Sequence, residues 1–337
     1  MRFLQQAPRL RRLTPPIVAA SLLVLSAALA AQSKPASARI SADDLMVWVR
    51  SLSSPEFEGR RSGTEGNMKA RGVIANRLRT LGITPLGDPP DTYIRPFQLT
   101  ARNAAPDPAT PLTNENRGAN VVGLCKGSGP ANGPAMVISA HYDHLGMRDG
   151  QMYPGADDNA SGVATVLALA GHCIATPWTH DAVFALFDAE ERGLQGARAF
   201  VANPPLPKSR IALDVNLDMV SRNAKHELYV AGTAQRPELG KVLEPIARRR
   251  GLISLRFGHD TTSAREGPMY DWTMQSDHGV FQQAGIPFVY FGVEDHEDYH
   301  KPTDTADKID PEFFRLAAET ILDSIDALDR WLSSPRQ

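Results

Sequence analysis

The sequence is poor in cysteine, in net charge and in long apolar runs. Its 337 residues include only two cysteines, Cys125 and Cys173, and its formal net charge is −2 at pH 7. Two cysteines cannot complete a structural zinc site by themselves, and a charge near zero indicates no basic surface for nucleic acid. We therefore expect no nucleic-acid partner, and we expect any metal site to consist of histidines and carboxylates.

The two cysteines are expected to be small buried apolar residues rather than a disulfide. Cys125 ends a strand-like run, and Cys173 lies on a helix-like one. Export from the cytoplasm would permit a bridge between them.

The apolar run near the N-terminus, residues 17–30, is short for a membrane span, which needs about 20 residues. It follows several arginines and ends in Ala28-Leu29-Ala30. This pattern predicts a cleaved signal peptide at 1–30, followed by a disordered leader at 31–40. We expect a periplasmic or extracellular protein with no stable membrane span after cleavage; an uncleaved membrane anchor is the alternative.

Residues 41–337 are predicted to form a single α/β domain. Apolar strands alternate with helices, which favours a mostly parallel sheet covered on both faces in three αβα layers. The principal strands are expected at 93–99, 120–125, 136–140, 182–187, 211–217, 226–230, 253–257 and 288–291. The helices are expected at 41–52, 64–81, 162–173, 194–202, 237–250, 277–284 and 311–332.

Acids and histidines follow several of these strands directly. Glu190 and Glu191 come after 182–187, and Asp218 comes after 211–217. His141 follows 136–140, and His300 lies on the loop after 288–291. Ligands of open sheets collect at the carboxyl ends of the strands, and buried acids are costly unless a cation binds them. The sequence therefore predicts that these side chains converge on one edge of the sheet.

The neighbouring residues suggest a division of roles. Two adjacent carboxylates, Glu190 and Glu191, fit one metal ligand and one general base. Asp143 follows His141 by two positions, so on an extended strand end both lie on one face and Asp143 can orient the imidazole. One acid of the pair Asp157-Asp158 can bridge two cations. Taken singly, each motif also fits an ordinary surface pair or helix cap, and His144, His259, His278 and His296 are expected to be loop or outer histidines.

Six strings occur in one order along the chain: HYDHLG, GADDNASGVA, AEERGLQG, NLDMV, SDHGVF and YHKPTDT. With them the sequence, from about Ser41 onward, resembles the secreted di-zinc aminopeptidases, the bacterial leucyl-type zinc exopeptidases. Glutamate carboxypeptidases and glutaminyl cyclases are related to that family. The resemblance implies a zinc-exopeptidase fold of the phosphorylase/hydrolase-like type and two Zn²⁺ ions, with cobalt or manganese as alternatives.

The resemblance also implies the site residues. Asp158 would bridge the two ions, His141 and Asp218 would complete one zinc site, and Glu191 and His300 would complete the other. Glu190 would be the general base and Asp143 would orient His141. The residues implied for substrate binding are Met219, Tyr299 and Tyr270, with Trp272 as the alternative to Tyr270.

The implied function is that of a zinc-dependent aminopeptidase, a metallopeptidase that removes the N-terminal residue from peptides with a free N-terminus. A water between the two zinc ions would attack the peptide carbonyl after Glu190 takes its proton. One alternative is a glutaminyl cyclase on the same fold, which would use one zinc. Another is a carboxypeptidase, for which Arg222 and Arg265 would have to bind the substrate carboxylate. A third is a receptor-like relative without activity, which would lack metal ligands.

Overall fold

The computed structural model describes residues 39–101, 104–107, 109–113, 116–249, 251–261 and 270–334. The predicted signal peptide at 1–30 and residues 31–38 of the predicted leader lie outside the described residues. Arg39–Gln337 forms one compact unit. Ile40 is buried in its core, so the unit already includes the last two residues of the segment that we expected to be a leader.

The centre of this unit is a nine-stranded sheet. Its strands are β1 (Thr84–Pro85), β2 (Ile94–Gln98), β3 (Arg117–Cys125), β4 (Ala135–His141), β7 (Asp181–Phe187), β8 (Ile211–Leu217), β9 (Glu227–Ala231), β10 (Ser254–Phe257) and β11 (Phe288–Gly292). They lie in the order β1-β3-β7-β4-β8-β11-β9-β10, and β2 pairs with β3. The middle strands β7, β4, β8 and β11 are mutually parallel, whereas β3 and β9 join them antiparallel. The predicted mostly parallel sheet is confirmed.

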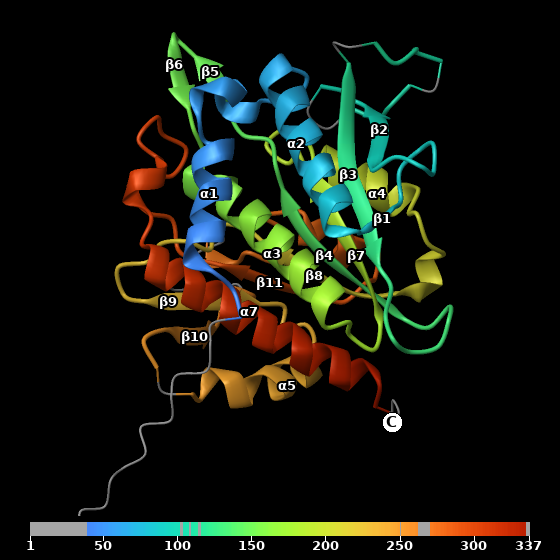
Figure 1. The fold of residues 1–337 in the computed structure, drawn as a ribbon, viewed down its shortest axis with the longest axis vertical. Coiled ribbons are helices and arrows are strands. Elements are labelled where there is room, and N and C mark those ends of the chain that lie inside the picture. Colours follow the sequence, from blue (N-terminus) through green and yellow to red (C-terminus); the bar gives the residue numbers. More distant parts are fainter. Residues whose placement is uncertain are drawn as a thin grey trace, which may run out of the picture. The chain divides into compact units, whose positions relative to one another are not determined.

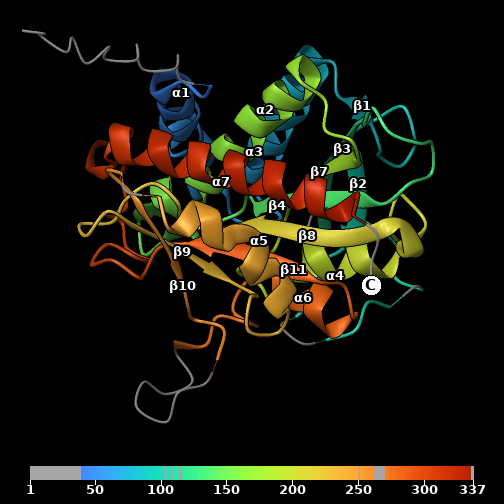
Figure 2. The ribbon, with the colours of Figure 1, turned by 90° about the horizontal axis from the view of Figure 1, so that it is seen from below.

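Helices cover both faces of the sheet, as the views in Figures 1 and 2 show. One face carries α1 (Ala42–Leu52), α2 (Glu65–Leu81), α3 (Gly162–Ala175), α5 (Pro237–Ala247) and α7 (Pro311–Leu332), which share a large apolar cluster with the sheet. The other face carries α4 (Gln195–Ala202) and α6 (His278–Gln283), which pack around Phe187, Phe200 and Phe281. The predicted three αβα layers are thus present.

The helix boundaries follow from local signals in the sequence. The side chain of Thr64 caps the start of α2 by accepting from the backbone N–H of Asn67, and Gly82 ends the helix in a left-handed conformation. Asp310 caps α7 in the same way, and Pro311 occupies its first position. These helices begin and end close to the predicted residues, because capping depends only on neighbours in the chain.

Cys125 and Cys173 form a disulfide, with their Cα atoms 6.4 Å apart. The prediction of two unpaired buried thiols was wrong. Cys125 is the last residue of β3, and Cys173 lies on α3, which packs against that strand. The fold therefore brings together two residues that are 48 positions apart in sequence. The short strands β1, β5 (Gly146–Arg148) and β6 (Gln151–Tyr153) were also not predicted.

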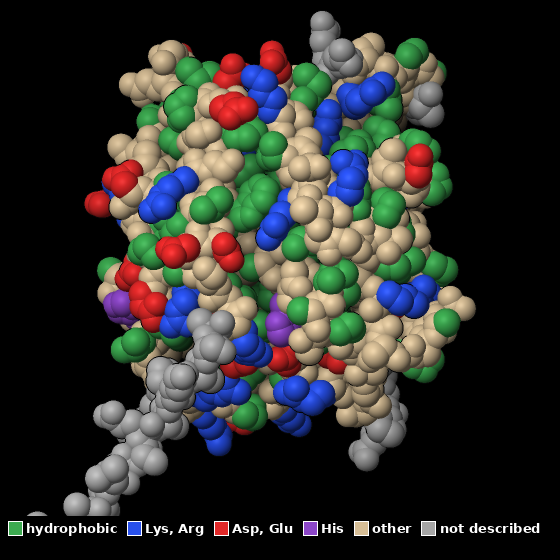
Figure 3. Space-filling model, in the orientation of Figure 1, with side chains coloured by type: hydrophobic (Ala, Val, Ile, Leu, Met, Phe, Trp, Pro, Cys, Tyr) green, Lys and Arg blue, Asp and Glu red, His purple; other side chains and the backbone are tan. Residues whose placement is uncertain are grey.

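Charged side chains of both signs are interspersed on the face seen in Figure 3, in keeping with the small net charge. Within the described ranges, no helix combines the length and the apolar character needed to cross a membrane.

Candidate metal centre

The parallel strands deliver the predicted site residues to one edge of the sheet. His141 is the last residue of β4, and Asp218 directly follows β8. Glu190 and Glu191 lie just beyond β7, and His300 lies on the loop after β11. Since β4, β7, β8 and β11 are parallel, their carboxyl ends share this edge.

Asp158 reaches the same place from the one-turn helix η2 (Ala156–Ser161), which precedes α3. The carboxylate of Asp304 accepts hydrogen bonds from the backbone N–H groups of Asp157 and Asp158, each 3.1 Å long. The side chain of Asn159 donates to the carbonyl of Leu217 at the end of β8. These bonds fix the position of Asp158 relative to the strand ends.

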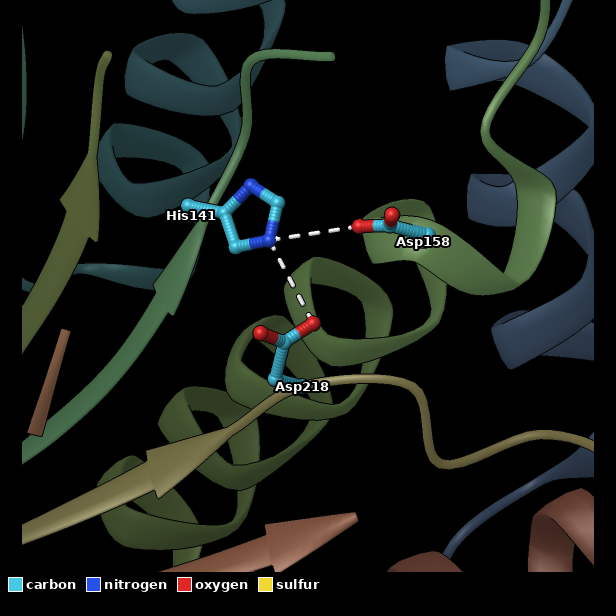
Figure 4. A group of neighbouring side chains, drawn as sticks. All are labelled: His141, Asp158 and Asp218. Atoms are coloured by element: carbon cyan, nitrogen blue, oxygen red, sulfur yellow. Dashed lines mark hydrogen bonds and ion pairs between the residues drawn. The ribbon is translucent and has the colours of Figure 1, made fainter. Parts of the chain in front are cut away.

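Asp158 divides its two carboxylate oxygens between two groups of side chains. Its Oδ1 lies 3.3 Å from His141 Nε2, which is also 3.3 Å from Asp218 Oδ1. Figure 4 shows the imidazole of His141 facing these two carboxylates, which come from different segments. All three donor atoms are close enough to hold one metal ion.

The second group lies on the other side of Asp158. Its Oδ2 is 3.1 Å from His300 Nε2, and that nitrogen is 3.4 Å from Glu191 Oε1. The five residues predicted as metal ligands therefore lie together. His144, which we expected to be an outer histidine, also belongs to this group: its Nδ1 is 2.8 Å from Glu191 Oε1 and 3.7 Å from Asp158 Oδ2.

The residues of these groups fit a bound cation. Both ring nitrogens of His144 and the Oε1 atom of Glu191 are buried and have no hydrogen-bond partner. Buried polar atoms are costly when they are left unpaired. Imidazole nitrogens and carboxylate oxygens are the ligands that zinc accepts besides thiolates, so a zinc ion in the second group would satisfy these atoms.

Asp143 contacts the imidazole of His141 more closely through its backbone carbonyl than through its carboxylate. The backbone carbonyl of Asp143 lies 3.1 Å from His141 Nδ1, whereas its Oδ1 lies at 3.7 Å. The carboxylate instead accepts hydrogen bonds from the Ser62 hydroxyl and from the backbone N–H of Glu190, both 3.0 Å long. Asp143 thus ties the loop of Glu190 to the end of β4.

A cavity of about 400 Å³ opens beside the two groups. Glu190 lines it, as do Met219 and Tyr299, which we expected to bind substrate. Tyr270 is not among its lining residues: its ring is 45% exposed and stacks on His259. Trp272, the alternative to Tyr270, does line it. Among the lining residues that we did not predict are Tyr290, Val293 and Arg198.

The buried carboxylates and imidazoles shift one another's pKa values. Burial raises the pKa of Glu190 well above its ordinary value, and the carboxylates of Glu191 and Asp277 add to this effect. Burial also acts to raise the pKa of Glu191, but the nearby imidazoles of His144 and His300 outweigh it and lower the pKa to about 2. Glu190 therefore holds a proton more tightly than its neighbour, which separates the two adjacent acids chemically.

A larger hollow of about 1100 Å³ lies elsewhere on the surface, lined by residues such as Lys208, Arg236 and Trp331. It contains none of the candidate metal ligands, so we place the chemistry in the smaller cavity.

Comparison with known proteins gives consistent matches. Residues 120–325 match peptidase family M28. Aminopeptidase YwaD of Bacillus subtilis is 28% identical over 213 residues, which cover 60% of this chain and 43% of that protein. The probable lipoprotein aminopeptidase LpqL of Mycobacterium tuberculosis is 28% identical over 225 residues, with the same two shares. The chain thus spans less than half the length of either relative.

Solved structures share the fold. BSAP, a zinc aminopeptidase from Bacillus subtilis, superposes with a TM-score of 0.66 at 18% identity, covering 85% of this chain and 95% of that chain. A glutaminyl cyclase from Porphyromonas gingivalis gives a TM-score of 0.64 at 18% identity, covering 86% and 98%. The family match extends over more than half of the sequence and includes every candidate metal ligand: the chain belongs to peptidase family M28.

Proposed function

We propose that this chain is a zinc-dependent aminopeptidase that removes the N-terminal residue from peptides. The observation that carries the proposal is the placement of Asp158, whose two oxygens face two separate groups of ligands. A carboxylate in this position can bridge two cations. His141 and Asp218 would hold one zinc ion, and Glu191 and His300 would hold the other.

Two bound zinc ions would polarise the scissile carbonyl and lower the pKa of a water between them. The chain's own residues would then handle the protons. Glu190 lines the cavity beside both groups, and its raised pKa suits a group that accepts a proton from water and later gives it to the leaving amine. The hydrogen bond from its backbone N–H to Asp143 holds it in place.

The lining of the cavity favours a substrate with a free amine. Several carboxylates line it, and a substrate ammonium group would find opposite charge beside them. Apolar and aromatic side chains line it as well: Met219, Trp272, Tyr290, Val293 and Tyr299. We infer that the amine lies next to the metal groups and that the first side chain of the peptide lies against these apolar residues.

The carboxypeptidase alternative is less well supported. It needs a cation that is free to bind the substrate carboxylate. Arg222 already pairs with Asp298 at 2.8 Å, and Arg265 lies outside the described residues. Arg198 lines the cavity, so it is the residue to test if C-terminal cleavage is ever found.

We also infer that the protein is exported. The disulfide between Cys125 and Cys173 is a bond that persists in oxidising compartments. Expression in a bacterial host, followed by fractionation and N-terminal sequencing of the mature protein, tests both export and cleavage after residue 30.

The decisive experiment assays the zinc-loaded chain on a leucyl-p-nitroanilide, on its N-acetylated form and on peptides that begin with glutamine. We expect hydrolysis of the free-amine substrate, loss of hydrolysis when the amine is acetylated or a chelator is added, and no cyclisation of glutamine. Cyclisation without hydrolysis would favour the glutaminyl cyclase, and equal cleavage of the acetylated substrate would refute the aminopeptidase.

The role of Glu190 is tested separately with Glu190→Gln, which keeps the shape of the side chain but cannot take the proton. We expect kcat to fall roughly 10²–10⁴-fold, while the zinc content of the protein, measured by mass spectrometry, stays unchanged. Wild-type activity in this variant would remove Glu190 from the proposed reaction.

A further inference from the structure

His144 is a buried histidine whose position the proposed reaction does not explain. It is 1% exposed and lies three residues after His141, in the loop that follows β4. Its ring lies on Gly155, where even a Cβ atom would come within 2.6 Å of the ring atoms. The chain therefore leaves room for this imidazole next to the segment that carries Asp158.

The Nδ1 atom of His144 lies at ion-pair distance from Glu191. The two atoms Nδ1 and Glu191 Oε1 are 2.8 Å apart, yet both are buried and neither has a hydrogen-bond partner. Two buried ligand atoms held this close together are in the arrangement that a shared cation stabilises.

The same carboxylate oxygens have a second imidazole nearby. His300 Nε2 lies 3.1 Å from Asp158 Oδ2 and 3.4 Å from Glu191 Oε1. The rings of His144 and His300 have their centroids 5.8 Å apart, so they are separate neighbours of one pair of oxygens. The group on the other side of Asp158 contains a single histidine, His141.

We propose that His144 is a fourth protein ligand of the metal ion held by Asp158, Glu191 and His300. The two metal positions are then different: one has two imidazoles and two carboxylates, and the other has His141 with Asp158 and Asp218. A water shared with the other ion would make zinc bound by four protein ligands five-coordinate, whereas zinc with three protein ligands binds that water as its fourth ligand and can still add the substrate. The His141 position is therefore the one that meets the scissile carbonyl. This inference rests on the proposed function only in taking the two-zinc centre as given.

The test counts imidazoles on zinc in the full chain loaded with two equivalents of zinc, by X-ray absorption spectroscopy without any peptide. We expect about three imidazole nitrogens over the two ions in the wild type and about two in His144→Ala and His144→Gln. The matched control is His172→Gln, which removes a histidine of α3 away from the cavity and should leave the count unchanged. Circular dichroism reports whether each variant is folded.

The wild-type count decides the inference even if the variants fail to fold. A total of two imidazoles in the wild type would overturn it and would leave His144 as a residue that only positions Glu191. The count is independent of turnover. Three imidazoles in a protein without peptidase activity would refute only the proposed function, whereas two in an active peptidase would refute only the role of His144.

Discussion

Arg60 is a fully buried arginine whose guanidinium donates to four backbone carbonyls. It bonds to the carbonyls of Tyr142, Leu52, Pro154 and Gly155, over distances of 2.6–2.9 Å. Tyr142 belongs to the loop of His141 and His144, and Gly155 directly precedes the turn that carries Asp158. One side chain thus joins the loop that carries His141 and His144 to the turn that carries Asp158.

Burial lowers the pKa of Arg60 to about 10, although nearby carboxylates such as Asp158 act to raise it. The group is therefore still charged at neutral pH. We expect Arg60→Met to lower the free energy of unfolding by at least about 3 kcal/mol, because several buried carbonyls lose their donor. Arg60→Lys keeps the charge and part of the bonding, so it should lose less stability and bind zinc better than the methionine variant. Urea unfolding measures the stability of each variant, and zinc titration measures its affinity for zinc. Equal stability and equal affinity in the two variants would contradict this role of Arg60.

His278 is a buried neutral histidine that makes the stability of the fold depend on pH. Burial lowers its pKa to about 4, and its Nε2 lies 2.7 Å from the carbonyl of Trp272. Its pKa rises toward the ordinary 6.5 on unfolding, so between pH 4 and 6.5 the unfolded chain binds a proton that the folded chain does not bind. The stabilisation is complete above pH 6.5 and is lost as the pH falls toward 4.

We expect the wild type to lose about 3 kcal/mol more stability between pH 7 and pH 4 than His278→Gln does. Glutamine can keep the hydrogen bond to Trp272 but cannot take up a proton in this range. Chemical denaturation at closely spaced pH values gives the two slopes. Parallel slopes would show that His278 does not titrate on unfolding.

At the scale of the elements, the features set by neighbours in the chain were predictable. Thr64 and Gly82 mark the ends of α2, and the apolar run 211–217 becomes β8 without change. The order of strands and acids also places His141 and Asp218 at one edge, since parallel strands align their carboxyl ends.

Features that depend on distant contacts were not predictable. His144 occupies a loop, where the sequence does not determine which way a side chain points. Tyr270 was expected to bind substrate, but its ring lies against His259 instead. Cys125 and Cys173 meet only because α3 packs on β3. In each case the deciding contact joins residues that are at least 11 positions apart in the chain.

The disulfide connects a strand to a helix and closes a loop of 48 residues. A cross-link over such a loop restricts the unfolded chain and contributes about 4 kcal/mol in the chain-entropy estimate. We expect the double variant Cys125→Ala, Cys173→Ala to unfold at a lower urea concentration by an amount equivalent to about 2–4 kcal/mol.

Reducing agent should destabilise the wild type and leave the double variant unaffected. Neither cysteine lines the cavity, so the double variant should bind as much zinc as the wild type. A wild type that is insensitive to reductant while unfolding would contradict this contribution.

At the scale of the whole molecule, acidic side chains are concentrated in one cavity, although the net charge of the chain is small. The carboxylates of Asp158, Glu190, Glu191 and Asp218 all line it, and like charges this close oppose folding when no cation is present. The N-terminal part of the chain, although it precedes the residues matched by the family, helps to hold this arrangement through Arg60 and Ser62. Metal binding and folding should therefore be coupled over the entire unit.

Zinc that binds only the folded chain stabilises it by about 2.7 kcal/mol at a free concentration one hundred times the Kd. We expect this to raise Tm by about 4 °C and a chelator to reverse it, with magnesium at the same concentration having little effect. Asp158→Asn should lose most of the response, because Asp158 belongs to both ligand groups. Asp329→Asn is the matched control, since Asp329 pairs with His180 away from the cavity. Calorimetry over a range of free zinc measures the response, and an undiminished shift in Asp158→Asn would mean that the stabilising zinc binds somewhere other than at the carboxyl ends of these strands.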